Sequence, residues 1–416
     1  MMNKRPLFSK NAFTIWLMIA LIALAFNLRS PLTAIPPIVN EIRSALHINA
    51  TTAGLLTSIP ILCFGILTPL ASFIINRTSL KFSILMTLGG CILGTLIRAS
   101  GSFGGLISGT IIIGMALTIG NIVSLLIIAK DFPHKSHIVT GLYTSALNIG
   151  TMLSSALTAP MAHYWGWQTA LASWVDLALL ALVLWVVIFY AEKSIASPSN
   201  DTLPSDQETA KATADILKGD NKTHNFFHRQ LVQILVISFA AHLCVYYGLT
   251  AWIPSFLRQS NHMTSSQAGA AAAFFQILAL LGSFGIPVLS QRFSSAFLLR
   301  VIGLCWLVTP VGLLWMPSLW LFWLVLGGFA AGGGFTVIFS TVIQFSRNLD
   351  DNRRISSAVQ GVGYIFASAS PLLIGFLHQS YGDWQWAFYF LSLASLPLFW
   401  TGFRLKKVEK FYSKKA

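Results

Sequence analysis

Long apolar runs constrain this chain more than any other feature of its sequence. Twelve such runs follow one another with polar connections, and each is about long enough to cross a hydrocarbon core about 30 Å thick. Backbone N–H and C=O groups find no water in lipid, so runs of this length indicate helices. We therefore predict an all-α membrane protein with twelve transmembrane helices. The spans lie near 14–36, 51–74, 82–98, 104–129, 138–160, 169–190, 230–252, 267–289, 297–315, 319–343, 355–377 and 386–404.

The positive charge of the chain follows a membrane topology. The formal net charge is +14, although charged residues make up only 10% of the sequence. With both termini in the cytoplasm, the outer loops hold only Arg43, Arg98 and Arg258, and Arg29 lies inside a span. Every other Lys or Arg then falls on the cytoplasmic side, as the positive-inside rule requires. The charge indicates a multi-pass protein of the inner or plasma membrane whose partner is the lipid bilayer, not nucleic acid.

One polar segment divides the chain. Residues 193–228 are rich in Ser, Thr, Asp, Lys and Asn and predict a solvated cytoplasmic linker. It separates an N-terminal six-helix bundle at 1–192 from a C-terminal six-helix bundle at 229–416. We therefore expect six spans before this linker and six after it.

The two halves repeat each other. The segment Trp-Gln-Thr-Ala-Leu at 167–171 recurs as Trp-Gln-Trp-Ala-Phe at 384–388, and at the same offset Lys130 aligns with Arg347. Parallel repeats of six spans are the design of many secondary transporters, in which the solute binds near the midplane between the halves. The repeat predicts pseudo-symmetric bundles with a central site.

Arg29 is the most informative single residue. It lies roughly 21 Å along the first apolar run, deep in the hydrocarbon core. A charge at that depth normally faces a partner or a watery pathway, and a guanidinium suits a planar anion. Pro31 and the pair at 36–37 should break the outer half of this helix, and such a break is tolerated where it lines a cavity. Asn27 and Thr33 lie close enough to add polar contacts. Alternatives are an internal brace, in which Arg29 pairs with Asp176 or helix carbonyls, and snorkelling.

Further polar residues occur inside other spans. His242 and Tyr246 share a face of the seventh span, the counterpart of the first. Tyr247 approaches the outer interface, where aromatic residues are ordinary, so it is a weaker candidate. The remaining candidates for contact with a solute are Asn121, Tyr143, Gln276, Gln360 and Tyr364. For each, the alternative is an amide, ring or hydroxyl that only joins neighbouring helices.

Charges near the cytoplasmic ends predict a gate there. Arg77, Asp131, Arg347 and Arg354 flank span ends and could pair when the cavity faces outward. Asp176, by contrast, lies inside the sixth span, where it is either a proton-coupling carboxylate or, as we favour, a counter-ion or a group near the outer interface.

Several classes of protein are excluded by motifs. The four cysteines lie in apolar spans without metal-ligand spacing, and the glycine clusters are not followed by the Lys of a phosphate loop. The spans hold no nucleophile with a base, and no pair of carboxylates. We expect no enzyme activity, no cofactor and no metal.

Short motifs distributed over both halves resemble one known family. They are Asn27–Thr33, Ala53–Pro60, Gly120–Val123, Lys130–Pro133, Thr140–Tyr143 and Gly166–Gln168, then Tyr246–Tyr247, Trp252–Pro254, Gln267–Gly269 and Gln360–Tyr364. Together they resemble the cyanate/nitroimidazole permease branch of the major facilitator superfamily. The resemblance implies a permease for a small anionic or polar solute, such as cyanate or a nitroimidazole. We expect a monomeric secondary active or facilitative transporter, with protons as the candidate coupling ion. The alternative is a proton-coupled multidrug exporter, for which Asp176 would be the only intramembrane carboxylate.

Overall fold

Helices account for the regular structure of the described chain. The computed structural model describes residues 10–132, 136–195, 222–346 and 349–413, and no strand occurs among them. The N-terminal bundle contains α1 (Lys10–Asn27), α2 (Ser30–Thr33), η1 (Pro36–Ile38), α3 (Val39–Leu46), α4 (Ala50–Ile66), α5 (Thr68–Arg77), α6 (Leu80–Arg98), α7 (Phe103–Asp131), α8 (Ser136–Ala172) and α9 (Trp174–Ile195). The C-terminal bundle contains α11 (Lys222–Ser260), α12 (Ser265–Leu289), α13 (Ser295–Trp315), η4 (Pro317–Leu319), α14 (Trp320–Phe345), α15 (Leu349–Tyr381) and α16 (Gln385–Ser413).

Local sequence signals explain where many helices begin. The residue before the first turn is Asn49, Ser79, Ser102, Thr264 or Ser294, and in each case its side chain accepts a hydrogen bond from a backbone N–H of that turn. These caps satisfy N–H groups that have no partner within the helix. The helix starts therefore follow from the same polar residues that separate the apolar runs.

The membrane-spanning character of the sequence is confirmed, with one difference in counting. In the part of the chain that the structure describes, ten helical stretches are long and apolar enough to cross a bilayer, or eleven if the bent pair α4 and α5 is one span. One stretch, 142–192, holds 51 residues, or about 77 Å of helix, which is more than twice a bilayer core. Gly166 breaks it with a φ of 80°. If this stretch is two spans and α4 with α5 is one, the total equals the predicted twelve; with the ten stretches alone, the predicted number is not reached.

The repeat recurs in the structure. Gly166 and Gly382 both adopt a positive φ, of 80° and 76°, just before a buried tryptophan, Trp167 in one half and Trp384 in the other. A positive φ is accessible to glycine without strain, which accounts for a glycine at both turns. The turn that ends the fifth predicted span thus has its counterpart at the end of the eleventh.

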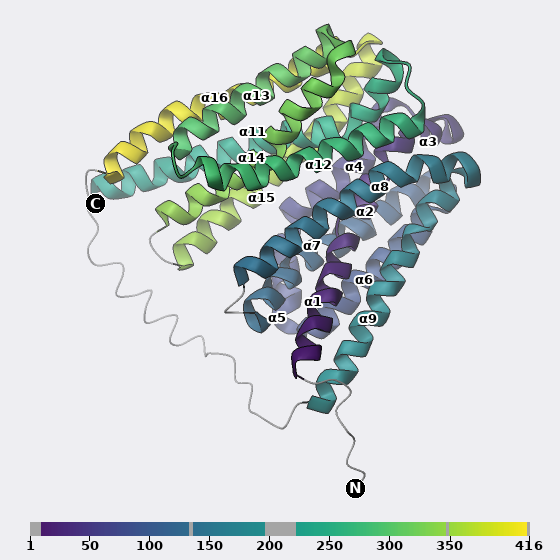
Figure 1. The fold of residues 1–416 in the computed structure, drawn as a ribbon. Helices are drawn as coiled ribbons and strands as arrows, with labels where there is room; N and C mark the ends of the chain where they lie inside the picture. Colours follow the sequence, from purple (N-terminus) through teal and green to yellow (C-terminus); the bar gives the residue numbers. More distant parts are fainter. Residues whose placement is uncertain (1–9, 133–135, 196–221, 347–348, 414–416) are drawn as a thin grey trace.

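The two bundles form a V (Figure 1). We call the end at which α1 begins and α16 ends the terminal face, and the opposite end, with α3 and the start of α12, the distal face. The bundles meet toward the distal face, where α4 packs against α15 and α8 against α12. Toward the terminal face they diverge.

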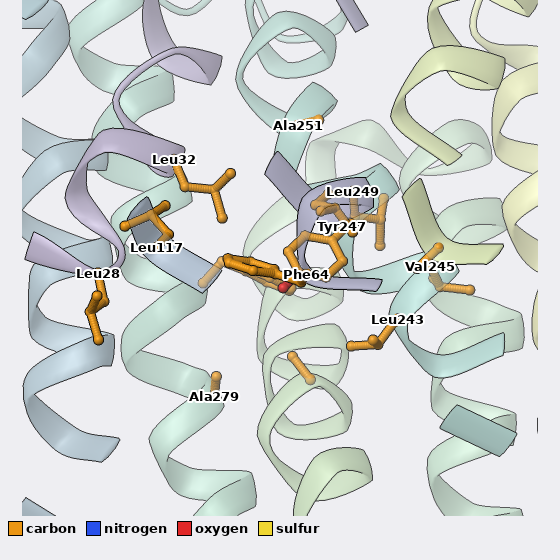
Figure 2. Close-up of a cluster of buried hydrophobic side chains, with 14 of the residues drawn as sticks. Leu28, Leu32, Phe64, Leu117, Leu243, Val245, Tyr247, Leu249, Ala251 and Ala279 are labelled. Atoms are coloured by element: carbon orange, nitrogen blue, oxygen red, sulfur yellow. The ribbon is translucent and has the colours of Figure 1, made fainter. Parts of the chain in front are cut away.

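Glycines permit the close contact between the bundles. A Cβ at Gly54 of α4 would lie 2.5 Å from the carbonyl oxygen of Pro371 in α15, and one at Gly375 would clash with the carbonyl of Ala50. The backbones of α4 and α15 can therefore approach only because these positions carry no side chain. Apolar side chains from both bundles pack beside Phe64 and Tyr247 (Figure 2).

Two predicted boundaries shift. The first span does not end near 36 but continues through α2, η1 and α3 to Leu46. Helices α9 and α11 extend into the predicted linker of 193–228, to Ile195 and from Lys222. The rest of that linker, 196–221, lies outside the described residues.

Candidate functional site

The first span is broken at Arg29, as the prolines predicted. Helix α1 ends at Asn27 and α2 begins at Ser30, with Arg29 at φ −123° and ψ −36° between them. Pro31 has no N–H to donate to the carbonyl of Asn27, so the hydrogen-bond ladder stops there. The break places Arg29 at a bend of the backbone in the interior of the protein, where its side chain is half-buried.

A large cavity lies between the bundles. Its volume is about 810 Å³, and its lining includes Arg29, Tyr246 and Tyr247. From there it extends to Ile75 and Ser356, close to the ends of α5 and α15 on the terminal face. A second pocket of about 20 Å³, the size of one water molecule, lies on the distal side of Arg29. Arg29 therefore separates the accessible cavity from the closed distal half.

Arg29 has uncharged partners. Its Nη1 donates to the hydroxyl of Tyr247 at 3.4 Å, and its guanidinium lies 6.0 Å from the centre of the Phe64 ring. Among the described residues no carboxylate lies within ion-pair distance of Arg29. Because the Tyr247 hydroxyl accepts from Arg29, its own proton stays available for another acceptor. The centre of the cavity thus carries one positive charge and hydroxyl groups that can donate to a bound anion.

Asp176 is not the partner of Arg29. It lies in the first turn of α9 with an exposed side chain, where its charge is favourably placed near the N-terminus of the helix. It does not line the cavity. The brace in which Asp176 neutralises Arg29 is therefore absent from this conformation, and the interpretation of Asp176 as a group near the outer interface fits its position.

Aromatic side chains surround Arg29. The ring centres of Tyr246 and Tyr247 are 5.0 Å apart, and those of Tyr247 and Tyr364 are 6.4 Å apart. Tyr364 also meets Phe64 edge to face at 5.4 Å, across the boundary between the bundles. The cavity around Arg29 is therefore lined mainly by aromatic side chains and carries only a few polar groups, as is common for small-molecule binding sites.

His242 lines the cavity but has a strong internal partner. Its Nδ1 accepts a hydrogen bond from the indole N–H of Trp306 at 2.9 Å, and its ring stacks on Tyr246 at 6.4 Å. A nitrogen that accepts a hydrogen bond carries no proton, so this geometry holds the neutral imidazole. The stacking confirms that His242 and Tyr246 share one face.

The other predicted site residues divide into two groups. Asn121, Tyr143, Gln360 and Tyr364 line the cavity, and the Tyr143 hydroxyl donates to Asn121 at 3.5 Å. Gln276 does not line it; it is buried and accepts from Tyr246 at 3.2 Å. Gln276 can therefore orient Tyr246 without contacting a solute.

Asn27 and Thr33 have structural partners. The amide of Asn27 donates to the carbonyls of Ala23 and Leu177, which joins α1 to α9. Thr33 bonds the hydroxyl of Ser154 at 2.6 Å and lines only the water-sized pocket. Both residues are buried away from the large cavity because the helix break turns Arg29 toward it and leaves these neighbours facing other helices.

Two important residues were missed from the sequence. Tyr247, the weaker candidate because of its place near the outer interface, is the hydrogen-bond partner of Arg29. The repeat aligns the neighbouring Tyr246 with Arg29 and so pointed to this part of the seventh span. Arg98, assigned to an outer loop, is 1% exposed and donates to the carbonyl of Pro31 at 2.7 Å. No sequence pattern marks this burial.

The distal face is closed by polar contacts between the bundles. Glu41 of α3 accepts from Arg258 of α11 at 2.8 Å and from Ser265 of α12 at 2.5 Å. Nearby, Asn40 donates to Ser255 at 3.4 Å. Glu41 and Arg258 are 217 residues apart, the offset of the repeat, so equivalent positions of the two halves pair across the pseudo-twofold axis. We call the contacts of Glu41 with Arg258 and Ser265 the distal gate.

The predicted cytoplasmic gate is not assembled here. Arg77, Asp131 and Arg354 have exposed side chains and form no ion pair with one another. Arg347 lies outside the described residues. A gate at the terminal face stays a prediction for the alternative conformation.

Known bacterial transporters are similar to this chain in sequence. Bacillus subtilis (strain 168) has an uncharacterized transporter that is 28% identical over 385 residues, covering 90% of either chain. A 2-nitroimidazole transporter of Escherichia coli (strain K12) is 28% identical, covering 89% of this chain and 90% of that one. A cyanate transport protein of the same organism is 24% identical over 96% of this chain and 100% of that one.

Solved structures share the fold at low identity. A nucleoside transporter (TM-score 0.71, 12% identity) matches 93% of this chain and 99% of its own. A D-xylose–proton symporter (TM-score 0.71, 15% identity) matches 93% and 97%. The profile of the Major Facilitator Superfamily matches residues 15–368 of this chain. The protein therefore belongs to the major facilitator superfamily, whose members are transporters of small solutes and not enzymes.

Proposed function

We propose that the protein carries a small anionic or polar solute across the inner or plasma membrane by alternating access, with Arg29 as the principal binding group. The observation that carries this proposal is the position of Arg29, which lines the large cavity without a carboxylate partner among the described residues. A buried, unneutralised guanidinium favours an anion or a strongly polar planar group. The relatives include transporters of 2-nitroimidazole and cyanate, both small and polar, which supports this class of solute.

The terminal face is proposed to face the cytoplasm. The positive-inside rule supports this orientation, because Lys and Arg concentrate at the ends of helices on that face. In this orientation the cavity opens to the cytoplasm and the distal gate seals the outer side. We expect the monomer to be the transporting unit, because the cavity is formed within one chain.

Proton-coupled drug export is the alternative. The cavity volume of about 810 Å³ could accept a drug-sized molecule, so volume alone does not select between the two functions. Such an exporter needs a carboxylate that takes up a proton in the cavity, and no Asp or Glu occurs among the described residues that line it. The lining therefore supports the anion or polar-solute carrier.

Uptake into proteoliposomes tests the proposal. The panel should hold cyanate, 2-nitroimidazole, small carboxylates and cationic dyes, each measured with and without an imposed pH gradient. We expect saturable uptake of at least one small anionic or polar solute and none of the cationic dyes. Efflux of cationic dyes driven by the pH gradient, without transport of any anion or azole, would favour the exporter instead.

A further inference from the structure

Arg98 is a second buried arginine of the N-terminal bundle. It ends α6, is 1% exposed, and its Nη1 donates to the carbonyl oxygen of Pro31 at 2.7 Å. It does not line the large cavity or the water-sized pocket. Its guanidinium therefore faces the protein interior and not the path of a solute.

The carbonyl of Pro31 needs a partner because of the sequence that follows it. In a continuous helix it would accept from the N–H of Ile35, but α2 ends at Thr33, and the last backbone bond of this turn runs from Ala34 to Ser30. Among the described residues no backbone N–H reaches Pro31 oxygen. A free carbonyl at membrane depth is costly, so a side-chain donor is required.

The backbone around Arg98 is held as tightly as its guanidinium. A Cβ at Gly109 of α7 would lie 2.5 Å from the backbone nitrogen of Arg98 and 2.7 Å from its Cβ. Helix α7 thus approaches α6 closely at the turn that carries Arg98. As the last residue of α6, Arg98 also lies where a positive charge is favoured by the helix dipole.

The burial of the Arg98 guanidinium costs free energy, because part of it is unsatisfied. Its Nε and Nη2 have no hydrogen-bond partner among the described residues. Burying a charge with two nitrogens that lack a hydrogen-bond acceptor is unfavourable, so the one contact that is made must contribute to the structure. That contact is with the broken segment that carries Arg29, two residues before Pro31.

We propose that Arg98 is a positioning residue that fixes the broken segment of the first span and, through it, the place of Arg29 in the cavity. This role rests on the proposed function, because the placement of Arg29 affects transport only if Arg29 binds the solute. Arg98 itself makes no contact with the solute. Its guanidinium supplies the Pro31 carbonyl with the hydrogen bond that the helix backbone cannot supply. This contact holds the broken segment between α1 and α3 in one conformation.

Hydrogen–deuterium exchange on the full-length protein tests the proposal without a known solute. We expect Arg98→Leu to accelerate exchange of the amides in 28–38 about tenfold or more, since a charge-assisted hydrogen bond is removed. Arg98→Lys, which keeps one cationic donor, should fall between wild type and Arg98→Leu. The matched control is Arg300→Leu, which removes a guanidinium contact to the carbonyl of Ala296 in the other bundle and should leave 28–38 unchanged.

Labelling of Arg29 with phenylglyoxal gives a second readout at the site itself. Arg98→Leu should change the rate at which Arg29 is modified, by a factor of about three or more, because the side chain leaves its fixed position beside Tyr247. If Arg98→Leu does not fold, Arg98→Lys must show both the faster exchange of 28–38 and the changed rate of Arg29 modification.

Unchanged exchange of 28–38, or an equal rise at the counterpart segment 245–255, would overturn the proposal in favour of general stabilisation. Uptake of cyanate and 2-nitroimidazole by the same variants separates it from the proposed function. Local exchange that rises while uptake stays normal would retain the positioning role and refute solute binding by Arg29.

Discussion

Neutralising Glu41 should open the distal face. Its carboxylate joins α3 of one bundle to both α11 and α12 of the other, through Arg258 at 2.8 Å and Ser265 at 2.5 Å. Glu41→Gln keeps the shape of the side chain but removes the charge that holds Arg258. The conformation seen here, closed at the distal face, should then lose stability relative to the one closed at the terminal face.

The size of this loss in stability follows from how far the pair of Glu41 and Arg258 is shielded from solvent. The side chains of Arg258 and Glu41 are 28% and 33% exposed, so they are neither free in solvent nor buried. Exposed pairs contribute about 0.2–1 kcal/mol, and removal of one partner from a buried pair costs about 3–5 kcal/mol. An intermediate loss of about 1–2 kcal/mol shifts the ratio of the two conformations about 5- to 30-fold.

Cysteine accessibility measures this ratio. In a background without the native cysteines, Ala251→Cys would report on the small pocket beyond Arg29, and Ser283→Cys on the large cavity. An impermeant maleimide added to the distal side should label Ala251→Cys about 5- to 30-fold faster when Glu41→Gln is present. Labelling of Ser283→Cys from the terminal side should slow in parallel.

A charge exchange supplies the control. Glu41→Arg alone should open the distal face further than Glu41→Gln, whereas Glu41→Arg combined with Arg258→Glu should restore slow labelling. The matched pair is Lys81 with Glu192, which are 3.0 Å apart within the N-terminal bundle at the terminal face; exchanging them should leave the ratio unchanged. The reasoning is wrong if Glu41→Gln labels like wild type, or if the exchanged pair labels like Glu41→Arg alone.

Three further variants test individual contacts. Tyr247→Phe removes the hydroxyl that accepts from Arg29, and we expect solute affinity in equilibrium binding to fall about 2- to 10-fold, with normal affinity refuting its role. Gly54→Val forces α4 away from the Pro371 carbonyl; we expect a loss of about 1–3 kcal/mol of stability by thermal unfolding, and none for Gly89→Val, where the added atoms meet open space. Asp176→Asn should leave uptake rates unchanged between pH 6 and 8, because this exposed carboxylate lies outside the cavity; abolished uptake would return it to the coupling role.

Much of the architecture follows from the sequence because the bilayer restricts the choices. Apolar runs predict helices in lipid, and the polar residues between them act as helix caps, as Ser79 and Ser102 do. The break of the first span was predictable for a local reason: Pro31 removes a backbone donor wherever the chain folds. The duplication was readable because the segment that starts at Trp167 recurs at Trp384, and in the structure both tryptophans are buried after a glycine of positive φ.

The site was less predictable, because it depends on contacts between distant segments. Asn27 was expected at the cavity from its nearness to Arg29, yet its amide is taken by the carbonyl of Leu177, 150 residues away. Arg98 reads as a loop arginine at the end of an apolar run, and only the packing of α6 beside the broken span buries it. Side-chain direction after a helix break cannot be derived from periodicity, because the periodicity ends there.

The central claim is that Arg29 binds the solute, and uptake by Arg29 variants tests it most directly. Wild-type protein, Arg29→Lys and Arg29→Ala should be reconstituted at equal amounts, with thermal unfolding as a check that each is folded, and assayed with the best solute of the panel. We predict that both variants lose saturable uptake, because an ammonium group cannot reproduce the planar fork of the guanidinium. Uptake at the wild-type rate by folded Arg29→Ala would contradict the account.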